Sequence, residues 1–397
     1  MSADTDDGGP APLVRPPQLR TGEDRTASRL ELFVDLAYVL VIAQLAGGLT
    51  EDLTWHGATV FGGLFTVTWW SWVTITLYAN RFDTNDVPYR LIKLAAMFAV
   101  LVMAASATEA IGPQSGIFAT AYLATRVLLF ALYARAWQHV VEARATITIY
   151  LAGTGAGAAL WALSLVVPAP ARYWLWAGGI LLEAAAPLIA TRYGRNVPLH
   201  VEHLPERFGL FVILVLGESI ASVVHGMYET DWQTIPVVVA VVGFVIAAAL
   251  WWSYFDLGGA AGKQRLVDHG GDQESGTADR YVYGHLPLTL GLAAVAVGIE
   301  QFILHPVGEL TPGGRWALCA GAGLFMLGTA AVIAGTSHSW RAAWPWPTAV
   351  IPLVVVVGFL DELLPVASVS AIGIALLLTV LAGMREQQRG RIETTET

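Results

Sequence analysis

The sequence predicts an all-α polytopic membrane protein, with about twelve transmembrane helices in two parallel six-helix repeats. Composition is the first reason, because 55% of the 397 residues are hydrophobic and only 13% are charged, about half the charged share of a soluble domain. The second is a series of apolar stretches long enough to cross roughly 30 Å of hydrocarbon as helices. The third is a set of short motifs that occurs twice in the same order.

The chain opens with a polar segment, residues 1–28, which is rich in Pro, Gly, Asp and Arg and has no apolar core of a signal peptide. We expect a disordered cytoplasmic tail there, and a second cytoplasmic tail at 385–397. The predicted spans between them are 29–49, 57–79, 89–109, 116–137, 145–167, 172–192, 208–226, 235–256, 281–303, 316–336, 345–362 and 366–384.

The basic residues predict the orientation, because Lys and Arg concentrate in cytoplasmic loops. With the N-terminus inside, only Arg172 and Arg315 of the 22 Lys and Arg fall on the outer side, and Arg126 lies within the fourth span. This distribution predicts an even number of spans and places both termini in the cytoplasm.

Internal similarity predicts the repeats. The paired motifs are Arg29-x-x-Leu-Phe-Val and Arg207-x-x-Leu-Phe-Val, Arg81-Phe-Asp83 and Tyr254-Phe-Asp256, and Glu109 and Glu300. We therefore expect repeats at 29–198 and 199–384. Because each holds an even number of spans, an axis along the membrane normal should relate them, as in one class of transporters.

Charged side chains at membrane depth are the candidate functional residues, since burying them there is costly and they usually have a role. On the first helix, Glu31, Asp35 and Tyr38 fall at i, i+4 and i+7, on one face. The fourth helix contributes Arg126 and the sixth Glu183. We expect these groups to face the bundle interior.

The seventh helix repeats that spacing with Glu218, Ser222 and His225, and Ser219 lies next to the acid. We expect Arg126 to pair with one acid, and we take Glu218 as the first candidate for a proton or cation site, before Asp35 and Glu183. The alternative is structural, with Arg126 and Asp35 or Glu218 forming a buried ion pair that fixes helix register. One buried cation cannot neutralise all three acids, which favours the functional interpretation.

Other chemistry has no signature in this chain. The single cysteine, Cys319, excludes disulfides, and there is no phosphate-binding Walker loop, nucleophile elbow or His-Glu-x-x-His motif. The sequence therefore predicts a protein that is not an enzyme, with no metal site, cofactor or nucleic-acid partner. The expected partners are membrane lipids and an unknown small solute or ion, and the sequence is compatible with a homo-oligomer.

Four motifs carry a family resemblance: Glu31-Leu-Phe-Val-Asp35-Leu-Ala-Tyr38-Val, Asn80-Arg81-Phe82-Asp83-Thr84, Glu206-Arg207-Phe-Gly-Leu-Phe-Val-Ile-Leu-Val-Leu-Gly217-Glu218-Ser219 and Trp252-Ser-Tyr254-Phe255-Asp256. Over roughly residues 25–384 the chain resembles the bacterial low temperature requirement protein A family. The resemblance implies a multi-span protein of the bacterial inner membrane, linked in name to growth in the cold. It leaves the molecular activity open.

A shorter similarity bears on mechanism. Arg29-x-x-x-Phe33-x-Asp35 is similar to the Arg-x-x-x-Phe-Ser-Asp signature of the two-times-six-helix endolysosomal potassium channels, with Val34 in place of the serine. The second copy has Ile213 in place of the acid, a departure that weakens the case for ion conduction.

These observations favour a transporter or permease, proton-coupled, of unknown substrate. One alternative is a cation channel lined by the first helix of each half. Another is a non-transporting membrane protein that supports adaptation to cold by binding lipid or a partner.

Overall fold

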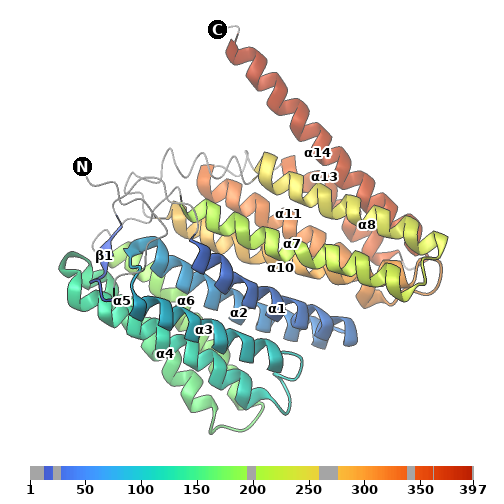
Figure 1. Ribbon diagram of the computed structural model, residues 1–397. Coiled ribbons are helices and arrows are strands. Elements are labelled where there is room, and N and C mark those ends of the chain that lie inside the picture. Colours follow the sequence, from blue (N-terminus) through green and yellow to red (C-terminus); the bar gives the residue numbers. More distant parts are fainter. Residues whose placement is uncertain are drawn as a thin grey trace.

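The structure, a computed structural model, describes residues 13–20, 28–194, 203–258, 276–337, 345–360 and 362–395. Over these residues it is all-helical, as predicted, apart from one pair of two-residue strands (Figure 1). The helices are α1 (Arg29–Glu51), α2 (Trp55–Arg81), α3 (Val87–Ser106), α4 (Ser115–His139), α5 (Arg144–Ser164), α6 (Ala171–Tyr193), α7 (His203–Glu229), α8 (Thr234–Trp252), α10 (Thr277–Leu304), α11 (Pro312–Ser337), α13 (Pro345–Phe359) and α14 (Pro365–Thr395). A 3₁₀ turn, η1 (Val141–Ala143), precedes α5, and a π-helical segment, η2 (Ser253–Gly258), extends α8.

Polar side chains fix where several helices begin. Ser28 and Glu31 form a capping box at the start of α1, in which each side chain bonds the other residue's backbone N–H. Thr54 caps α2, and Asp86 caps α3 with a proline directly after the first helical residue. These residues satisfy backbone N–H groups that have no partner within a first helical turn.

Eleven of the described helices are long and apolar enough to cross a membrane, so the chain is a multi-pass membrane protein. The eleventh of the twelve predicted spans, 345–362, differs. There α13 has only 15 residues, which is about 22 Å of helix at 1.5 Å per residue and less than the hydrocarbon thickness. Pro352 lies inside this helix.

The N-terminal segment, expected to be disordered, is partly ordered. Strand β1 (Gln18–Leu19) pairs antiparallel with β2 (Phe82–Asp83), which directly follows α2. Arg20 continues the contact, since its backbone N–H donates to Arg81 O and its Nη2 donates to Ala79 O. Disorder was therefore the wrong prediction for residues 13–20, while 1–12 and 21–27 lie outside the described residues.

The helices from α1 to α6 form one half of the molecule and those from α7 to α14 the other (Figure 1). In the first half, α1 packs on α2 and α3, and α2 packs on α6. In addition, α3 packs on α4, α4 on α5 and α5 on α6. The second half has corresponding neighbours. There α7 packs on α8 and α10, and α8 packs on α14. In addition, α10 packs on α11, α11 on α13 and α13 on α14.

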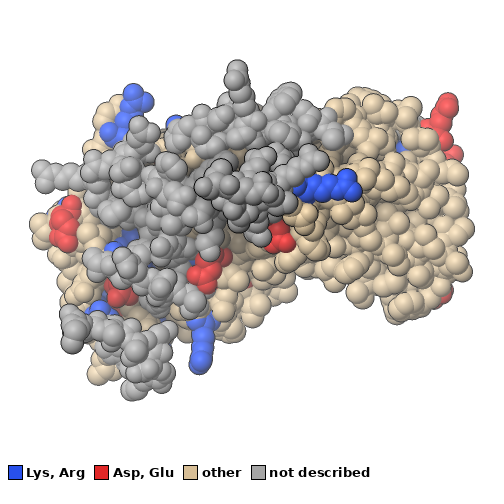
Figure 2. Space-filling model, turned by 90° about the horizontal axis from the view of Figure 1, so that it is seen from above, with Lys and Arg blue, Asp and Glu red and all other residues tan. Residues whose placement is uncertain are grey.

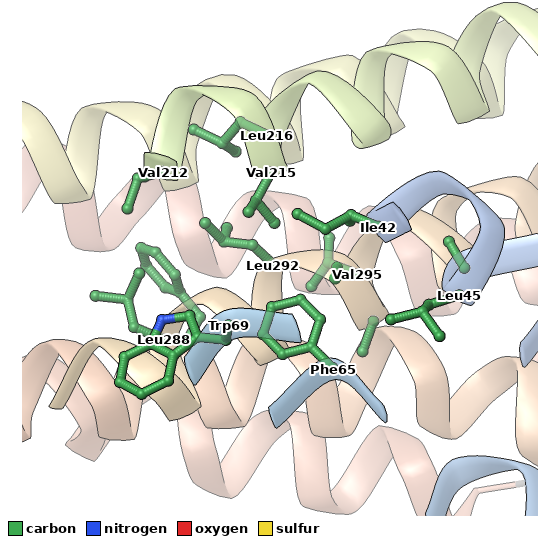
Figure 3. Close-up of a cluster of buried hydrophobic side chains, with 14 of the residues drawn as sticks. Ile42, Leu45, Phe65, Trp69, Val212, Val215, Leu216, Leu288, Leu292 and Val295 are labelled. Carbon is green, nitrogen blue, oxygen red and sulfur yellow. The ribbon is translucent and has the colours of Figure 1, made fainter. Parts of the chain in front are cut away.

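The seam between the halves is formed by α1 and α2 against α7 and α10. Its side chains are large and apolar, and one continuous hydrophobic cluster contains residues from both halves. Figure 3 shows this seam, where Ile42 and Phe65 of the first half approach Val215 and Val295 of the second. On the face in Figure 2, charged side chains are sparse over a broad part of the surface, as expected of a surface in contact with lipid.

Candidate functional site

A buried arginine on α4 is the centre of the first polar cluster. Arg126 Nη1 donates to Glu183 Oε2 of α6 at 3.0 Å and to Thr74 Oγ1 of α2 at 2.9 Å. Tyr122, one turn earlier on α4, donates its hydroxyl to the same Glu183 oxygen at 2.9 Å. The Arg126 guanidinium also lies over the Tyr122 ring, 4.7 Å from its centroid, a favourable cation–π arrangement.

The partner of Arg126 is therefore Glu183. The alternative that named Asp35 or Glu218 as partner is wrong, because Arg126 bonds Glu183 and Asp35 bonds Arg207. Both members of the Arg126–Glu183 pair have almost no exposed side-chain surface. A desolvated pair of this kind is held by its surrounding hydrogen bonds, here from Thr74 and Tyr122.

A second ion pair joins the two halves. Arg207, on the first turns of α7, donates from Nη1 to Asp35 Oδ2 at 2.8 Å and from Nη2 to Oδ1 at 3.0 Å. Trp72 Nε1 of α2 donates to Asp35 Oδ1 at 2.9 Å. The Asp35 carboxylate thus receives a bidentate guanidinium and an indole N–H, which is a strong and directional arrangement.

Helix α2 connects the two pairs. Ser71 lies next to Trp72, and its hydroxyl is 3.0 Å from the Tyr38 hydroxyl of α1. Its carbonyl oxygen accepts a long bond from Arg126 Nη2 at 3.5 Å. Polar contacts therefore run from the seam to the interior of the first half.

Glu31 belongs to the start of α1. Its Oε2 accepts from the Ser28 N–H and hydroxyl at 2.9 and 3.0 Å. Glu31, Asp35 and Tyr38 are all buried, so the shared helix face predicted from their spacing does point inward.

The α7 residues form a separate group in the second half. Ser219 and Ser222 are buried, Glu218 is half-buried and His225 is exposed. His225 Nε2 lies 3.6 Å from Glu300 Oε1 of α10. The structure therefore does not bring Glu218, the first candidate for a proton or cation site, to the Arg126 cluster.

Contributors to these clusters that were not predicted as site residues include Thr74, Trp72, Arg207 and Glu300. Arg207 and Glu300 were visible only as markers of the internal repeat. Thr74 is one of several threonines on its helix, and the pattern Trp69-Trp70-Ser71-Trp72 does not indicate which indole meets an acid. The roles of all four depend on neighbouring helices.

A cavity of about 350 Å³ lies at the other end of the first half, between α1, α2 and the connection from α3 to α4. Polar groups at its rim include Asp52 and His56, whose Nδ1 is 3.1 Å from Asp52 Oδ2. Hydrogen bonds from Thr54 and His56 lower the pKa of Asp52. The lining residues do not include Asp35 or Glu218. Within the described ranges, no three His, Cys, Asp or Glu side chains are grouped so that they could hold a metal ion.

Comparisons with known proteins give a family match and a relative for this chain. The family described as Bacterial low temperature requirement A protein (LtrA) matches residues 26–382. An uncharacterized protein of Rhizobium meliloti is 32% identical over an alignment of 327 residues, and the match covers 76% of this chain and 76% of the relative. The matched region contains both ion pairs and the α7 group.

Proposed function

We propose, from the premise that this chain belongs to the bacterial low temperature requirement A family, that it is a proton-coupled transporter of a small solute. It would lie in the bacterial inner membrane with both termini in the cytoplasm, and be built from two parallel six-helix repeats. Glu218 is the proposed proton site.

The observation that carries the proposal is the difference between Glu218 and the other acids at membrane depth. Asp35 and Glu183 each have an arginine partner. Glu218 is half-buried in the α7 span and has no cationic partner among the described residues. Its electrostatic neighbour is another acid, Glu300 of α10, which faces His225. A carboxyl in this position can take up and release a proton without breaking an ion pair, and such acids mark proton pathways.

The two proposed repeats are supported by the helix packing, because helices in the same position of each half have the same neighbours. In both halves the first helix contacts the second and third, the second contacts the sixth, and the later helices follow in sequence. Parallel repeats provide two similar bodies that rock against each other in alternating access.

The packing of the seam favours a carrier over an open channel. A pore between the first helices would run between α1 and α7, where Ile42, Leu45 and Val215 fill the space (Figure 3). A carrier closes such a path on one side at a time.

The test is dissipation of a pH gradient in proteoliposomes, with imposed sodium and potassium gradients. We expect flux from the wild-type protein and only the leak of empty vesicles from Glu218→Gln. Glu229→Gln is the matched control, because Glu229 lies exposed at the end of the same helix. Asp35→Asn is a poor probe, since it removes the partner of Arg207 and so tests folding as well as transport.

A second candidate is favoured by the two satisfied ion pairs, which suit a rigid scaffold that binds lipid or a protein partner. Under that function, wild type and Glu218→Gln would leak no more than empty vesicles. Equal flux from wild type and Glu218→Gln would keep transport but reject Glu218 as its proton site.

A further inference from the structure

The polar side chains of α7 form one stripe that leads from Glu218 to the end of the helix. Ser222, His225 and Glu229 follow Glu218 at i+4, i+7 and i+11, positions that share one face of a helix. Eleven residues cover about 16 Å of helix, so the stripe runs from the middle of the span to the end that the basic residues predict to be outside. The ionisable members become more exposed along it, from the half-buried Glu218 to the exposed His225 and Glu229.

Glu300 of α10 lies against this stripe. Its Oε1 is 3.6 Å from His225 Nε2, and the Ser222 hydroxyl lies within hydrogen-bonding reach of its carboxyl. The two helices approach closely here, because a Cβ at Gly226 would lie 2.7 Å from Ile303 Cγ2 of α10, about one turn beyond Ser222 and Glu300. The Glu300 side chain is 16% exposed, compared with 55% for His225, so it lies between the surface imidazole and the interior of the bundle.

The charged groups that act on Glu300 all belong to α7. They are Glu218, His225 and Glu229. The other helices packed on α7 include α1, α2 and α8, and α8 has no ionisable side chain. The ionisable residues nearest this end on α1 and α2 are Glu51, which is exposed, and His56, which faces Asp52. Within the described ranges, no Lys or Arg forms an ion pair with Glu300, so its carboxyl can bind a proton without losing a fixed cation.

We propose that His225 and Glu300 carry protons between the outer water and Glu218. A proton on His225 Nε2 passes to Glu300 Oε1, which leaves the imidazole neutral. It then passes from Glu300 to the Glu218 carboxylate, beside the Ser222 hydroxyl, which leaves Glu300 ionised again. Because 3.6 Å is longer than a direct hydrogen bond, a bridging water completes the first step. Chains of acids and histidines form proton relays in membrane proteins. This relay rests on the transport function proposed above and adds the route by which the proton reaches its site.

The test measures the initial rate of pH-gradient dissipation by the full chain in proteoliposomes, at several pH values on the acidic side. The variants are Glu300→Gln and His225→Gln, with Glu300→Asp to restore a carboxyl at the same place. His305→Gln and Glu309→Gln are the controls, because both side chains are exposed, directly after α10 and in the loop that follows. The Tm of each variant in detergent checks that it is folded.

We expect Glu300→Gln to lower the rate at least about tenfold at every pH, since a positioned proton-transfer group usually contributes that much or more, and Glu300→Asp to recover part of it. His225→Gln should lower the rate less. Its deficit should shrink as the acidic side becomes more acidic, because water then supplies protons to Glu300 directly. Both controls should match the wild-type rate, and all variants should keep the wild-type Tm.

Failure of the relay and failure of transport give different results. If the wild-type protein shows no flux, transport is rejected and the relay with it. If the wild type carries protons and Glu218→Gln does not, but Glu300→Gln keeps the wild-type rate, the relay alone is overturned. It is also overturned if the deficit of His225→Gln is the same at every pH, or if Glu300→Gln loses flux together with a lowered Tm and Glu300→Asp recovers none, as expected of a carboxyl that only packs.

Discussion

The buried arginines of the described chain make different contacts, although all are similarly buried. The described chain buries four arginines: Arg81, Arg126, Arg207 and Arg315. Arg126 and Arg207 each face one carboxylate, and Arg315 donates to Ser368 Oγ at 3.0 Å. Arg81 instead lies over the Tyr150 ring, 4.9 Å from its centroid. Because charge is costly in an apolar interior, each buried guanidinium needs such a contact.

At Asp35, the energetic role of the inter-half pair is testable. Asp35→Leu would leave Arg207 buried without its acceptor and should cost about 3–5 kcal/mol of unfolding free energy, whereas Asp35→Leu with Arg207→Met should recover most of it. Denaturant unfolding in micelles measures both, with Glu51→Gln as an exposed control on the same helix. A double variant no more stable than Asp35→Leu would contradict this account.

At Asp86, outside the spans, the prediction concerns pH. Burial acts to raise the pKa of Asp86, but hydrogen bonds from Arg135, from the Arg15 N–H and from the Tyr89 N–H outweigh it and lower the pKa below its ordinary value. The unfolded carboxyl titrates near 3.9. This stabilisation is therefore fully present above about pH 5 and is lost as the pH falls through the folded pKa.

The measurement is the Tm difference between wild type and Asp86→Asn across that range. The difference should be largest at neutral pH and shrink towards about pH 3, since the wild-type carboxyl is then protonated. A difference that stays constant over the whole range would show that Asp86 acts through its shape alone.

Glycines set how closely particular helices approach. A Cβ at Gly291 of α10 would lie 2.5 Å from Gly321 O of α11, and a Cβ at Gly328 would lie 2.4 Å from Leu288 N. Gly321 and Gly328 therefore allow α11 to pack closely on α10. Gly153 of α5 serves α6 in the same way, because its Cβ would meet Ala186 Cβ at 2.5 Å.

A glycine also positions the acid of the Arg126 pair. A Cβ at Gly157 would lie 2.6 Å from Glu183 Oε1, whereas one at Gly155 meets Phe130 at 3.4 Å. Both changes to Ala raise helix propensity equally, so their difference isolates packing. We expect Gly157→Ala to be about 1–3 kcal/mol less stable than Gly155→Ala in micelle unfolding. Equal stabilities would mean that Glu183 moves without cost.

The two halves of the molecule meet through an apolar seam with one buried ion pair, Asp35–Arg207. The two arginines predicted outside have structural contacts. Arg172 donates to Val167 O at 2.9 Å and to Ser115, and Arg315 to Ser368. Because these side chains hold turns at helix ends, they are poor guides to orientation, and the remaining basic residues still predict cytoplasmic termini.

The predicted orientation, with both termini in the cytoplasm, can be tested by labelling. In a Cys319→Ala background, Glu51→Cys and Glu142→Cys place exposed thiols at the end of α1 and in η1, just before α5. A membrane-impermeant maleimide should label Glu51→Cys in intact cells and Glu142→Cys only after permeabilisation. The reverse pattern would invert the molecule in the membrane, and labelling of both in intact cells would contradict the span assignment between them.

The sequence by itself determined the helical membrane class, nearly all of the spans and the inward face of Glu31, Asp35 and Tyr38, because hydropathy, length and helical spacing are local properties of the chain. The partners of the buried charges were decided by tertiary structure. Glu183 lies 57 residues from Arg126, and Arg207 lies 172 residues from Asp35. Several acids had the right depth, and only the packing of α1 on α7 and of α4 near α6 brought these particular carboxylates within hydrogen-bond distance of their arginines.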